Sequence, residues 1–203
     1  TLFGLGQTPV PEWVKTEITP EDAENFQTIF AKHEGAVSAP AAGLHFSREL
    51  LKRMEIKDVD WQELTVHCGM GEFKAIDVED LSKHRADAEE MHLGDNIVNA
   101  VEKAKEGGHH VCAVGTTTMR ALESAVTIPG KLCAFDGWTN KFIFPPYDFT
   151  IADMMVTNFH HPMSSQLIMA CAFGGYETIM NAYQAAVKEK YRFSTYGDAM
   201  LII

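Results

Sequence analysis

The chain has 203 residues, of which 46% are hydrophobic and 22% are charged, and its formal net charge is −11. This length and composition are ordinary for a soluble globular protein with one main domain, and no apolar run is long enough to span a bilayer. The negative charge argues against a nonspecific nucleic-acid-binding protein. The four cysteines form no CxxC pair, so we expect reduced thiols and a cytoplasmic location.

Signals for helices and strands alternate along the chain after a Gly- and Pro-rich connector at residues 1–18. Capping residues, glycine stops and apolar spacing predict helices that start at Thr19-Pro20, Ser47, Asp95, about Thr117 and Ser164, and after Gly174-Gly175. The predicted strands are 36–39, 64–66, 111–114, 142–144, 154–159 and 200–203. This alternation favours an α/β fold with mostly parallel pairing. We expect the helix from Ser164 and the last strand to be buried, because both are apolar throughout.

Polar residues gather at the ends of four predicted strands. These segments are Pro40–Phe46, His67–Gly71, Gly115–Thr118 and Thr157–His161. In α/β proteins, ligands bind at the carboxyl ends of the strands. The pattern therefore predicts one shared pocket.

The segment Val114–Ser124, VGTTTMRALES, has the densest polar cluster. Gly115 permits a tight turn, and the Thr116 and Thr117 hydroxyls with the free amides of a helix start form an anion site for a carboxylate or phosphate. The alternative is that one threonine caps the helix and the others are solvated. Arg120 and Glu123 lie three residues apart on the same helix, where side chains meet.

The histidines offer a base or a metal site. His45, between Leu44 and Phe46, suits a general base, but a hydrogen-bonded core histidine is the commoner role for a single histidine in such a sequence. His160 and His161 are adjacent, so on a strand they point to opposite faces, and the sequence has no HExxH motif. A catalytic metal is therefore not expected. Gly69-x-Gly71 lacks the third glycine of the dinucleotide-binding fingerprint, so the motif does not predict a dinucleotide site. Tyr176, Met180 and Tyr183 recur at helical spacing, which predicts that they belong to the core.

Six long segments together resemble the S-adenosylmethionine:tRNA ribosyltransferase-isomerase family of queuosine biosynthesis. They are EGAVSAPAAGLHF (34–46), LTVHCGMGEF (64–73), VGTTTMRALES (114–124), GWTNKFIFPPYDF (137–149), TNFHHPMSSQLIMACAFGG (157–175) and YRFSTYGDAMLI (191–202). The chain departs from the family pattern in three places. Ala41 and Glu72 each stand where a threonine is usual, and Ala86-Asp87 differ within the segment from His84 to Glu89.

The resemblance implies an irregular barrel-like α/β main domain. The family's N-terminal part and its inserted small β-barrel are not recognisable in this chain. We therefore expect residues 1–18 to be a connector from that region and residues 19–203 to be the C-terminal part of the catalytic domain.

The resemblance also implies a reaction. The ribosyl group of S-adenosylmethionine, a co-substrate, is transferred and isomerised onto 7-aminomethyl-7-deazaguanine at the wobble position of tRNA with a GUN anticodon. Epoxyqueuosine forms, and adenine and methionine leave, with no metal or further cofactor. The expected protein is a cytoplasmic monomer. A competing reading is a catalytically inactive fragment or paralogue that binds S-adenosylmethionine or tRNA, and a third is a metal-dependent hydrolase built on the histidines.

This chemistry assigns expected roles. His45 is the first choice for general acid or base, and Asn158 and His160 would contact ribose or the acceptor base. The turn Gly115-Thr116-Thr117 would hold the methionine carboxylate, with Arg120 assisting or pairing with Glu123. The remaining expected substrate contacts are Gly43, Gly69 and Gly71 against adenosine, and Tyr196 and Asp198 against the acceptor.

Overall fold

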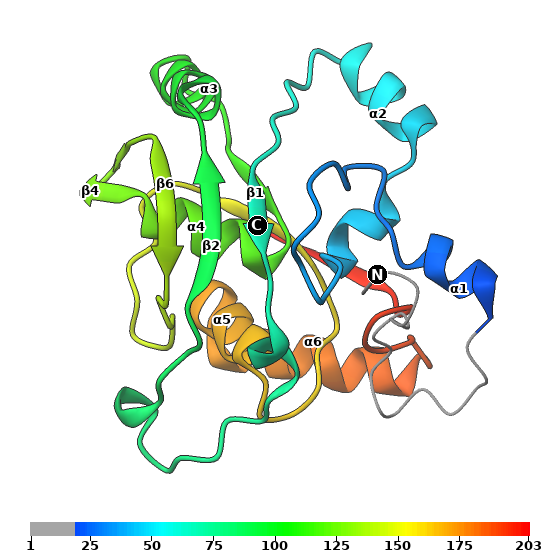
Figure 1. The fold of residues 1–203 in the computed structure, drawn as a ribbon. Coiled ribbons are helices and arrows are strands. Elements are labelled where there is room, and N and C mark those ends of the chain that lie inside the picture. Colours follow the sequence, from blue (N-terminus) through cyan, green and yellow to red (C-terminus); the bar gives the residue numbers. More distant parts are fainter. Residues whose placement is uncertain (1–18) are drawn as a thin grey trace, which may run out of the picture.

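Each described α-helix begins within one residue of its predicted start. The computed structural model describes residues 19–203, so the predicted connector lies outside the described residues (Figure 1). The helices are α1 (Pro20–Asn25), α2 (Arg48–Glu55), α3 (Asp95–Glu106), α4 (Thr116–Ser124), α5 (Ser165–Gly174) and α6 (Tyr176–Lys188). The side chains of Thr19, Ser47 and Ser164 accept hydrogen bonds from backbone amides of the first turns of α1, α2 and α5. α3 is capped by Gly94, not by Asp95 as predicted, and has no side-chain cap.

The strands form three separate sheets. β1 (Thr65–His67), β2 (Glu89–Leu93) and β6 (Phe135–Thr139) pair antiparallel in the order β1-β2-β6. β3 (Cys112–Val114), β7 (Met154–Asn158) and β8 (Ala199–Ile202) form the second sheet, and β4 (Val126–Ile128) pairs with β5 (Lys131–Leu132). The α/β class is confirmed, but the expectation of mostly parallel pairing is wrong, since β3 with β7 is the one parallel pair in residues 19–203. Over the same residues the sheets do not close into a barrel.

Two predicted strands are loops in the structure. Residues 36–39 join no sheet, although the Val37 amide donates to the Cys68 carbonyl oxygen (2.8 Å). Phe142 and Phe144 stack on each other with ring centroids 5.3 Å apart, so side-chain packing explains this apolar run better than strand pairing does. Short 3-10 turns η2 (Ala41–His45), η3 (Met70–Phe73) and η4 (Leu81–Lys83) occupy stretches where the sequence indicated no regular helix.

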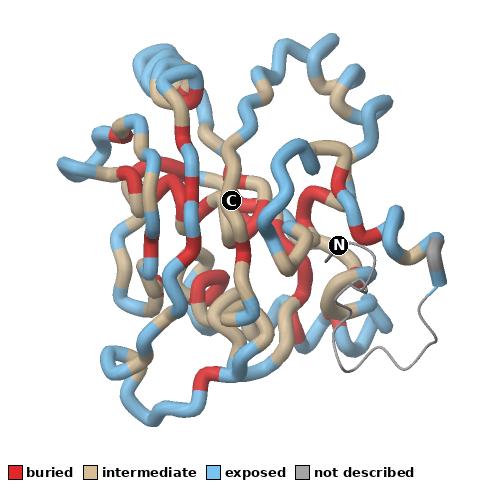
Figure 2. The backbone as a smooth tube through the Cα atoms, viewed as in Figure 1, coloured by how far each residue is buried: buried red, intermediate tan, exposed pale blue. Residues whose placement is uncertain are grey.

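Helix α4 lies at the centre of the core. It contacts β1 of the first sheet, β3 and β7 of the second, and α5. Its Met119 and Leu122 are buried, together with Met91 of β2 and Met155 of β7 (Figure 2). None of the described helices is long and apolar enough to cross a membrane.

Two elements are less buried than predicted. In α5 the residues Met169, Ala170 and Cys171 are buried, whereas the rest of the helix is at least partly exposed. β8 is an edge strand, in which Ile202 is buried and Leu201 is 56% exposed. Both elements therefore cover the core from one side.

The parallel pair β3 and β7 places two of the polar segments side by side. Val114 is in register with Val156, and the Gly115 amide continues the ladder by donating to the Val156 carbonyl oxygen (2.8 Å). Because both strands run the same way, the start of α4 and the residues after Val156 meet at one edge of the sheet.

Candidate active site

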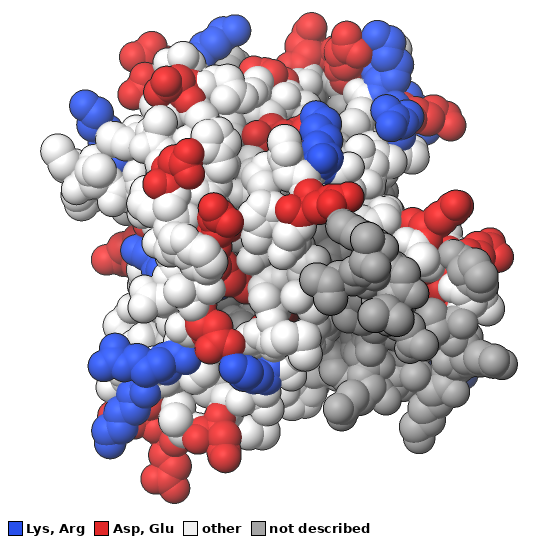
Figure 3. Space-filling model, in the orientation of Figure 1, with Lys and Arg blue, Asp and Glu red and all other residues white. Residues whose placement is uncertain are grey.

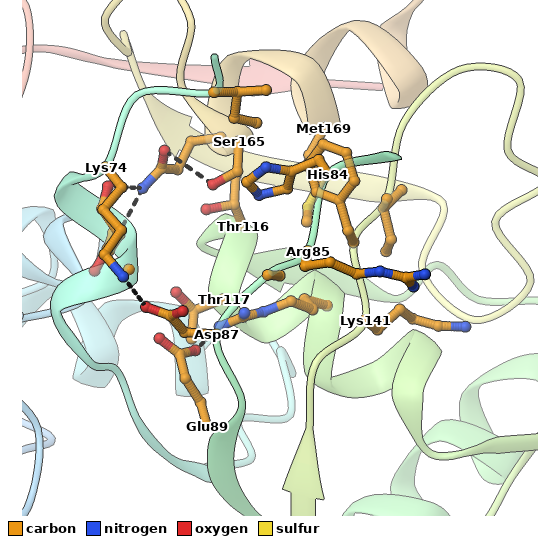
Figure 4. A pocket seen from close by; sticks show the side chains of 18 residues that line it. Lys74, His84, Arg85, Asp87, Glu89, Thr116, Thr117, Lys141, Ser165 and Met169 are labelled. Atoms are coloured by element: carbon orange, nitrogen blue, oxygen red, sulfur yellow. Dashed lines mark hydrogen bonds and ion pairs between the residues drawn. The ribbon is translucent and has the colours of Figure 1, made fainter. Parts of the chain in front are cut away.

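Two adjoining cavities open at this edge of the sheet. The larger, which we call the main cavity, has a volume of about 300 Å³, and the smaller, the side cavity, about 70 Å³ (Figure 4). They share the lining residues Glu72, Lys74, Thr116, Thr117 and Gln166. The main cavity is lined by residues 40–42, 72–75, 115–117 and 157–158 and by both His160 and His161. Three of the four predicted polar segments therefore line the main cavity, whereas of His67–Gly71 only Gly71 lines either cavity, namely the side cavity.

The start of α4 projects unsatisfied backbone donors toward these cavities. Gly115 is the N-cap, with φ of +95°, and no side chain caps the helix, so the reading of a threonine cap is wrong. Thr118 instead donates its hydroxyl to the Val114 carbonyl oxygen (2.8 Å), and the Thr117 hydroxyl accepts from the Cys68 thiol (3.7 Å). The first amides of α4 are therefore available to an anionic group. In Figure 4, Thr116 and Thr117 lie at this helix start.

Replacing Gly115 with alanine is expected to lower the free energy of unfolding by about 1 to 2 kcal/mol, because the positive φ penalises a side chain. Steric conflict is not the reason, since a Cβ there would meet the Ala42 Cβ at an ordinary 3.7 Å. Urea unfolding measures the change. Gly69→Ala is the matched control: a Cβ at Gly69 meets nothing within 4 Å, so its effect should stay within about 0.5 kcal/mol. Equal losses in the two variants would contradict the strain argument.

A buried ion pair holds the wall of the side cavity. Arg120 of α4 pairs with Glu89 of β2, and their side chains are 16% and 5% exposed. The second oxygen of Glu89 accepts the Gly69 amide (2.9 Å). Glu89 therefore ties the loop after β1 to α4 through Arg120.

Glu123 does not reach either cavity. Its carboxylate accepts the amides of Thr150 (2.9 Å) and Ile151 (3.0 Å) and the Tyr147 hydroxyl (3.1 Å). The expectation that Arg120 pairs with Glu123 is wrong, because Glu123 is buried against the loop at 147–151 while Arg120 turns to Glu89. Burial together with the Glu123 carboxylate raises the pKa of Tyr147.

Glu72 lies where the two cavities join. Its Oε1 accepts from the Gln166 side chain (3.1 Å), whereas Oε2 is buried and has no hydrogen-bond partner within residues 19–203. Burial raises the pKa of Glu72, and the nearby side chains of Ser38 and Gln166 oppose that rise. At a given pH the folded protein therefore holds this proton more firmly than the unfolded chain does.

This raised pKa predicts that Glu72→Gln stabilises the fold at neutral and higher pH. A carboxyl group whose pKa is raised by folding makes stability fall as pH rises above its unfolded value of about 4.3. The glutamine cannot ionise, so its free energy of unfolding should exceed that of the parent by about 1 to 3 kcal/mol at pH 8, with the difference shrinking toward pH 4. Urea unfolding at both pH values measures this. A variant less stable than the parent at pH 8 would show that the carboxylate is satisfied in the fold.

His45 and Asn158 are joined at the edge of the main cavity. Asn158 ends β7, is 2% exposed and lines this cavity. Its amide nitrogen donates to the Ser194 carbonyl oxygen (3.1 Å), which directs Oδ1 toward His45 Nε2 (3.2 Å). His45 itself is exposed and lines an adjacent outer hollow of about 520 Å³. Thr195 lines both spaces, so they adjoin.

His160 lines the main cavity as a neutral ring. Burial, with a smaller effect of His161, lowers the pKa of His160 to about 4. Its Nε2 is 2.7 Å from the Thr157 hydroxyl, and its amide donates to the Tyr183 hydroxyl (2.8 Å). A neutral, hydrogen-bonded imidazole suits ligand contact better than proton donation near pH 7.

The remaining expected contacts lie in different places. Gly71 lines the side cavity, whereas Gly43 faces a separate groove beside Phe30, and Gly69 serves to donate its amide to Glu89. Tyr196 lines the outer hollow with His45 and packs edge-on against Phe26 (5.0 Å). Asp198 lines none of these cavities. It accepts the Arg192 amide (2.7 Å), and this contact lowers the pKa of Asp198.

Several lining residues were missed by the sequence interpretation. They are Glu72, Lys74, His84, Arg85, Glu89, Lys141, Gln166 and Met169. Glu89 could have been predicted, because it lies on the same strand face as the apolar residues Met91 and Leu93. A charged side chain on a buried face needs a partner of opposite charge. The others come from loops and from α5 and had no such pattern. Within the described part of the chain, no three His, Cys, Asp or Glu side chains are grouped as metal ligands.

Fold and site together define an α/β protein with a ligand cavity at the carboxyl ends of a parallel strand pair, beside a helix start that suits an anion. A family model described as queuosine biosynthesis protein matches residues 1–202, and the chain belongs to that family.

Named relatives agree with this assignment. The S-adenosylmethionine:tRNA ribosyltransferase-isomerase of Parabacteroides distasonis is 60% identical over 202 residues, and that of Phocaeicola vulgatus is 58% identical. Both matches cover 100% of this chain and 58% of the relative, so the chain spans about 58% of the length of these proteins. The crystal structure of S-adenosylmethionine tRNA ribosyltransferase from Thermotoga maritima is similar, with a TM-score of 0.67 and 38% identity, over 80% of this chain and 51% of that one.

Proposed function

We propose that the protein takes part in transfer and isomerisation of the ribosyl group of S-adenosylmethionine onto 7-aminomethyl-7-deazaguanine in tRNA, with release of adenine and methionine. The observation that supports this most is the main cavity, in which five of the six segments of the family resemblance meet. Relatives that are 58% and 60% identical carry the corresponding name. Residues 19–203 would be the C-terminal part of the catalytic domain, with residues 1–18 as a connector.

The proposed binding mode starts from the amides at the beginning of α4. The methionine carboxylate lies against Gly115, Thr116 and Thr117, where no side chain competes for the amides. Asn158 and neutral His160 contact the ribose from the end of β7. His45 transfers a proton from the adjoining outer hollow. In this assignment, the carboxylates of Glu123 and of Asp198 have structural roles only.

The proposed second substrate is tRNA with a GUN anticodon. Lys74, Arg85 and Lys141 line the side cavity, and Figure 3 shows Lys and Arg side chains together on the lower part of this face. Asp and Glu side chains lie among them in Figure 3, so the support for an approach of the phosphate backbone comes from the basic residues that line the cavity itself. We further propose that the protein is a cytoplasmic monomer. Its four free cysteines support the cytoplasmic location, because thiols stay reduced in that compartment.

Two measurements on one preparation test the function. Calorimetry reports S-adenosylmethionine binding, and chromatography reports adenine released in the presence of tRNA that carries the aminomethyl precursor base. Binding with release supports the transferase. Binding without release favours the alternative, an inactive binding module, and absence of binding overturns both.

A further inference from the structure

The Glu72 carboxyl group lies at the junction of the two cavities, and no ion pair with a residue of the described part of the chain balances its charge. It lines both cavities, and Gln166 holds its Oε1 in place with a 3.1 Å hydrogen bond. Gln166 also reaches the Glu72 backbone carbonyl oxygen (3.4 Å), so this side chain fixes the loop and the carboxyl group together. The buried Oε2 forms no hydrogen bond of normal geometry within residues 19–203, although the Ser38 side chain lies close enough to the carboxyl group to lower the pKa of Glu72.

Within residues 19–203, the charges around Glu72 do not supply a counter-ion. Arg120 of α4 favours ionisation of Glu72, but it is already paired with Glu89, and Glu89 itself opposes that ionisation. The thiol of Cys68 is protonated, because burial is the main cause that raises its pKa. On the β7 side the main cavity is lined by His160, which is neutral, and by His161. Lys74, the next basic residue along the chain, pairs with Asp87 at 2.6 Å.

We propose that Glu72 is the counter-ion for a cationic, non-hydrogen-bonding centre of the ligand, the sulfonium of S-adenosylmethionine. A sulfonium has no N–H or O–H group, so it needs a bare negative charge rather than an acceptor already in use. Oε2 meets that description, and it lies within one cavity system with the α4 amides that suit the carboxylate of the same ligand. This inference rests on the proposed function and names the residue that recognises the charge of the donor.

Binding then moves one proton. Without ligand, burial favours the neutral form of the Glu72 carboxyl group, in which the proton is bonded to a carboxyl oxygen. When the sulfonium arrives, the O–H bond breaks, the electron pair stays on Glu72 as a carboxylate, and the proton passes to the buffer. S-adenosylhomocysteine has the same skeleton without the methyl group and the positive charge, so it leaves Glu72 protonated.

Calorimetry in two buffers of different ionisation enthalpy counts these protons. We expect S-adenosylmethionine to release up to about one proton for each ligand bound near pH 7, and S-adenosylhomocysteine to release none. Glu72→Gln keeps the shape and the Gln166 contact, so the variant should still bind ligand. It should release no proton and lose about tenfold or more of the preference for S-adenosylmethionine over S-adenosylhomocysteine.

Asp87→Asn is the matched control, because Asp87 is an acid of the side cavity that is exposed and paired with Lys74. Proton release should be unchanged in this variant. Binding of S-adenosylmethionine without proton release, or an unchanged preference in Glu72→Gln, overturns the role of Glu72 while leaving the proposed function standing. Failure of the parent protein to bind S-adenosylmethionine at all overturns the proposed function and this inference with it.

Discussion

Arg120→Ala should lower the free energy of unfolding by about 3 to 5 kcal/mol, the usual cost of breaking a buried ion pair by removing one partner. The variant leaves the Glu89 carboxylate, 5% exposed, without its cation. The Gly69 amide, 2.9 Å from Glu89 Oε1, cannot replace a full positive charge. Urea unfolding measures the loss, and because Glu89 links the loop after β1 to α4, we expect S-adenosylmethionine binding to weaken with it.

The control is the exposed pair of Lys74 with Asp87, whose side chains are 64% and 48% exposed. Lys74→Ala should change the free energy of unfolding by less than about 1 kcal/mol, because solvent screens this pair. A double variant, Arg120→Met with Glu89→Leu, should recover much of the stability lost in Arg120→Ala, since no uncompensated charge remains. If the double variant were as unstable as Arg120→Ala, lost packing rather than the unpaired charge would be the cause.

The helices were predictable because their signals are local. Ser47 and Ser164 cap helices from positions fixed by the sequence itself, and the glycines at 107 and 174–175 mark helix boundaries. Sheet membership was less predictable, because a strand is defined by a partner distant in sequence. β6 was missed since Asp136 and Gly137 interrupt its apolar alternation, and it exists by pairing with β2.

The same distinction separates the predicted from the missed parts of the site. The segment after Gly115 and the segment ending β7 were found, because glycine, threonine and asparagine after an apolar run are visible locally. The interactions of Glu89 with Arg120 and of Glu72 with Gln166 span 31 and 94 residues. The residues next to Glu89 or Glu72 in the sequence do not indicate the distant partner. These two interactions could therefore be identified only from the structure. The sequence therefore offered only Glu123 as a pairing partner for Arg120, and that alternative is wrong.

Substitutions at Glu72 and at Arg120 should have different effects, because the environments of the two side chains differ. Arg120 is a buried cation whose partner is supplied by the protein, and it is expected to act on stability first. Glu72 is a partly exposed residue whose buried Oε2 has no hydrogen bond of normal geometry among the described residues, and its replacement by glutamine is expected to stabilise the fold and impair selectivity. Stability and ligand discrimination should thus change in opposite directions at Glu72 and together at Arg120.

His45→Ala should slow adenine release by about 10²- to 10⁴-fold, the range expected when a general acid or base is lost, with little change in S-adenosylmethionine affinity. Asn158 Oδ1 can only accept a hydrogen bond, and it faces His45 Nε2 at 3.2 Å. Neutral His45 therefore carries its proton on Nε2 and keeps the lone pair on Nδ1, which is the atom that can take a proton. Single-turnover assays with precursor tRNA measure the rate, and His109→Ala, an exposed histidine after α3, should leave it unchanged.

A double-variant cycle decides whether His45 transfers a proton or only positions Asn158. If His45 acts solely by holding the amide, His45→Ala adds nothing once Asn158 has been replaced by alanine. If it transfers the proton, the double variant remains slower than Asn158→Ala by most of the factor seen for His45→Ala alone. The proton-transfer role predicts the second result, because the amide is also held by the Ser194 carbonyl oxygen (3.1 Å) and does not depend on His45 for its position. Equal rates for the double variant and Asn158→Ala would remove His45 from the chemistry and leave Asn158, inside the main cavity, as the group that contacts substrate.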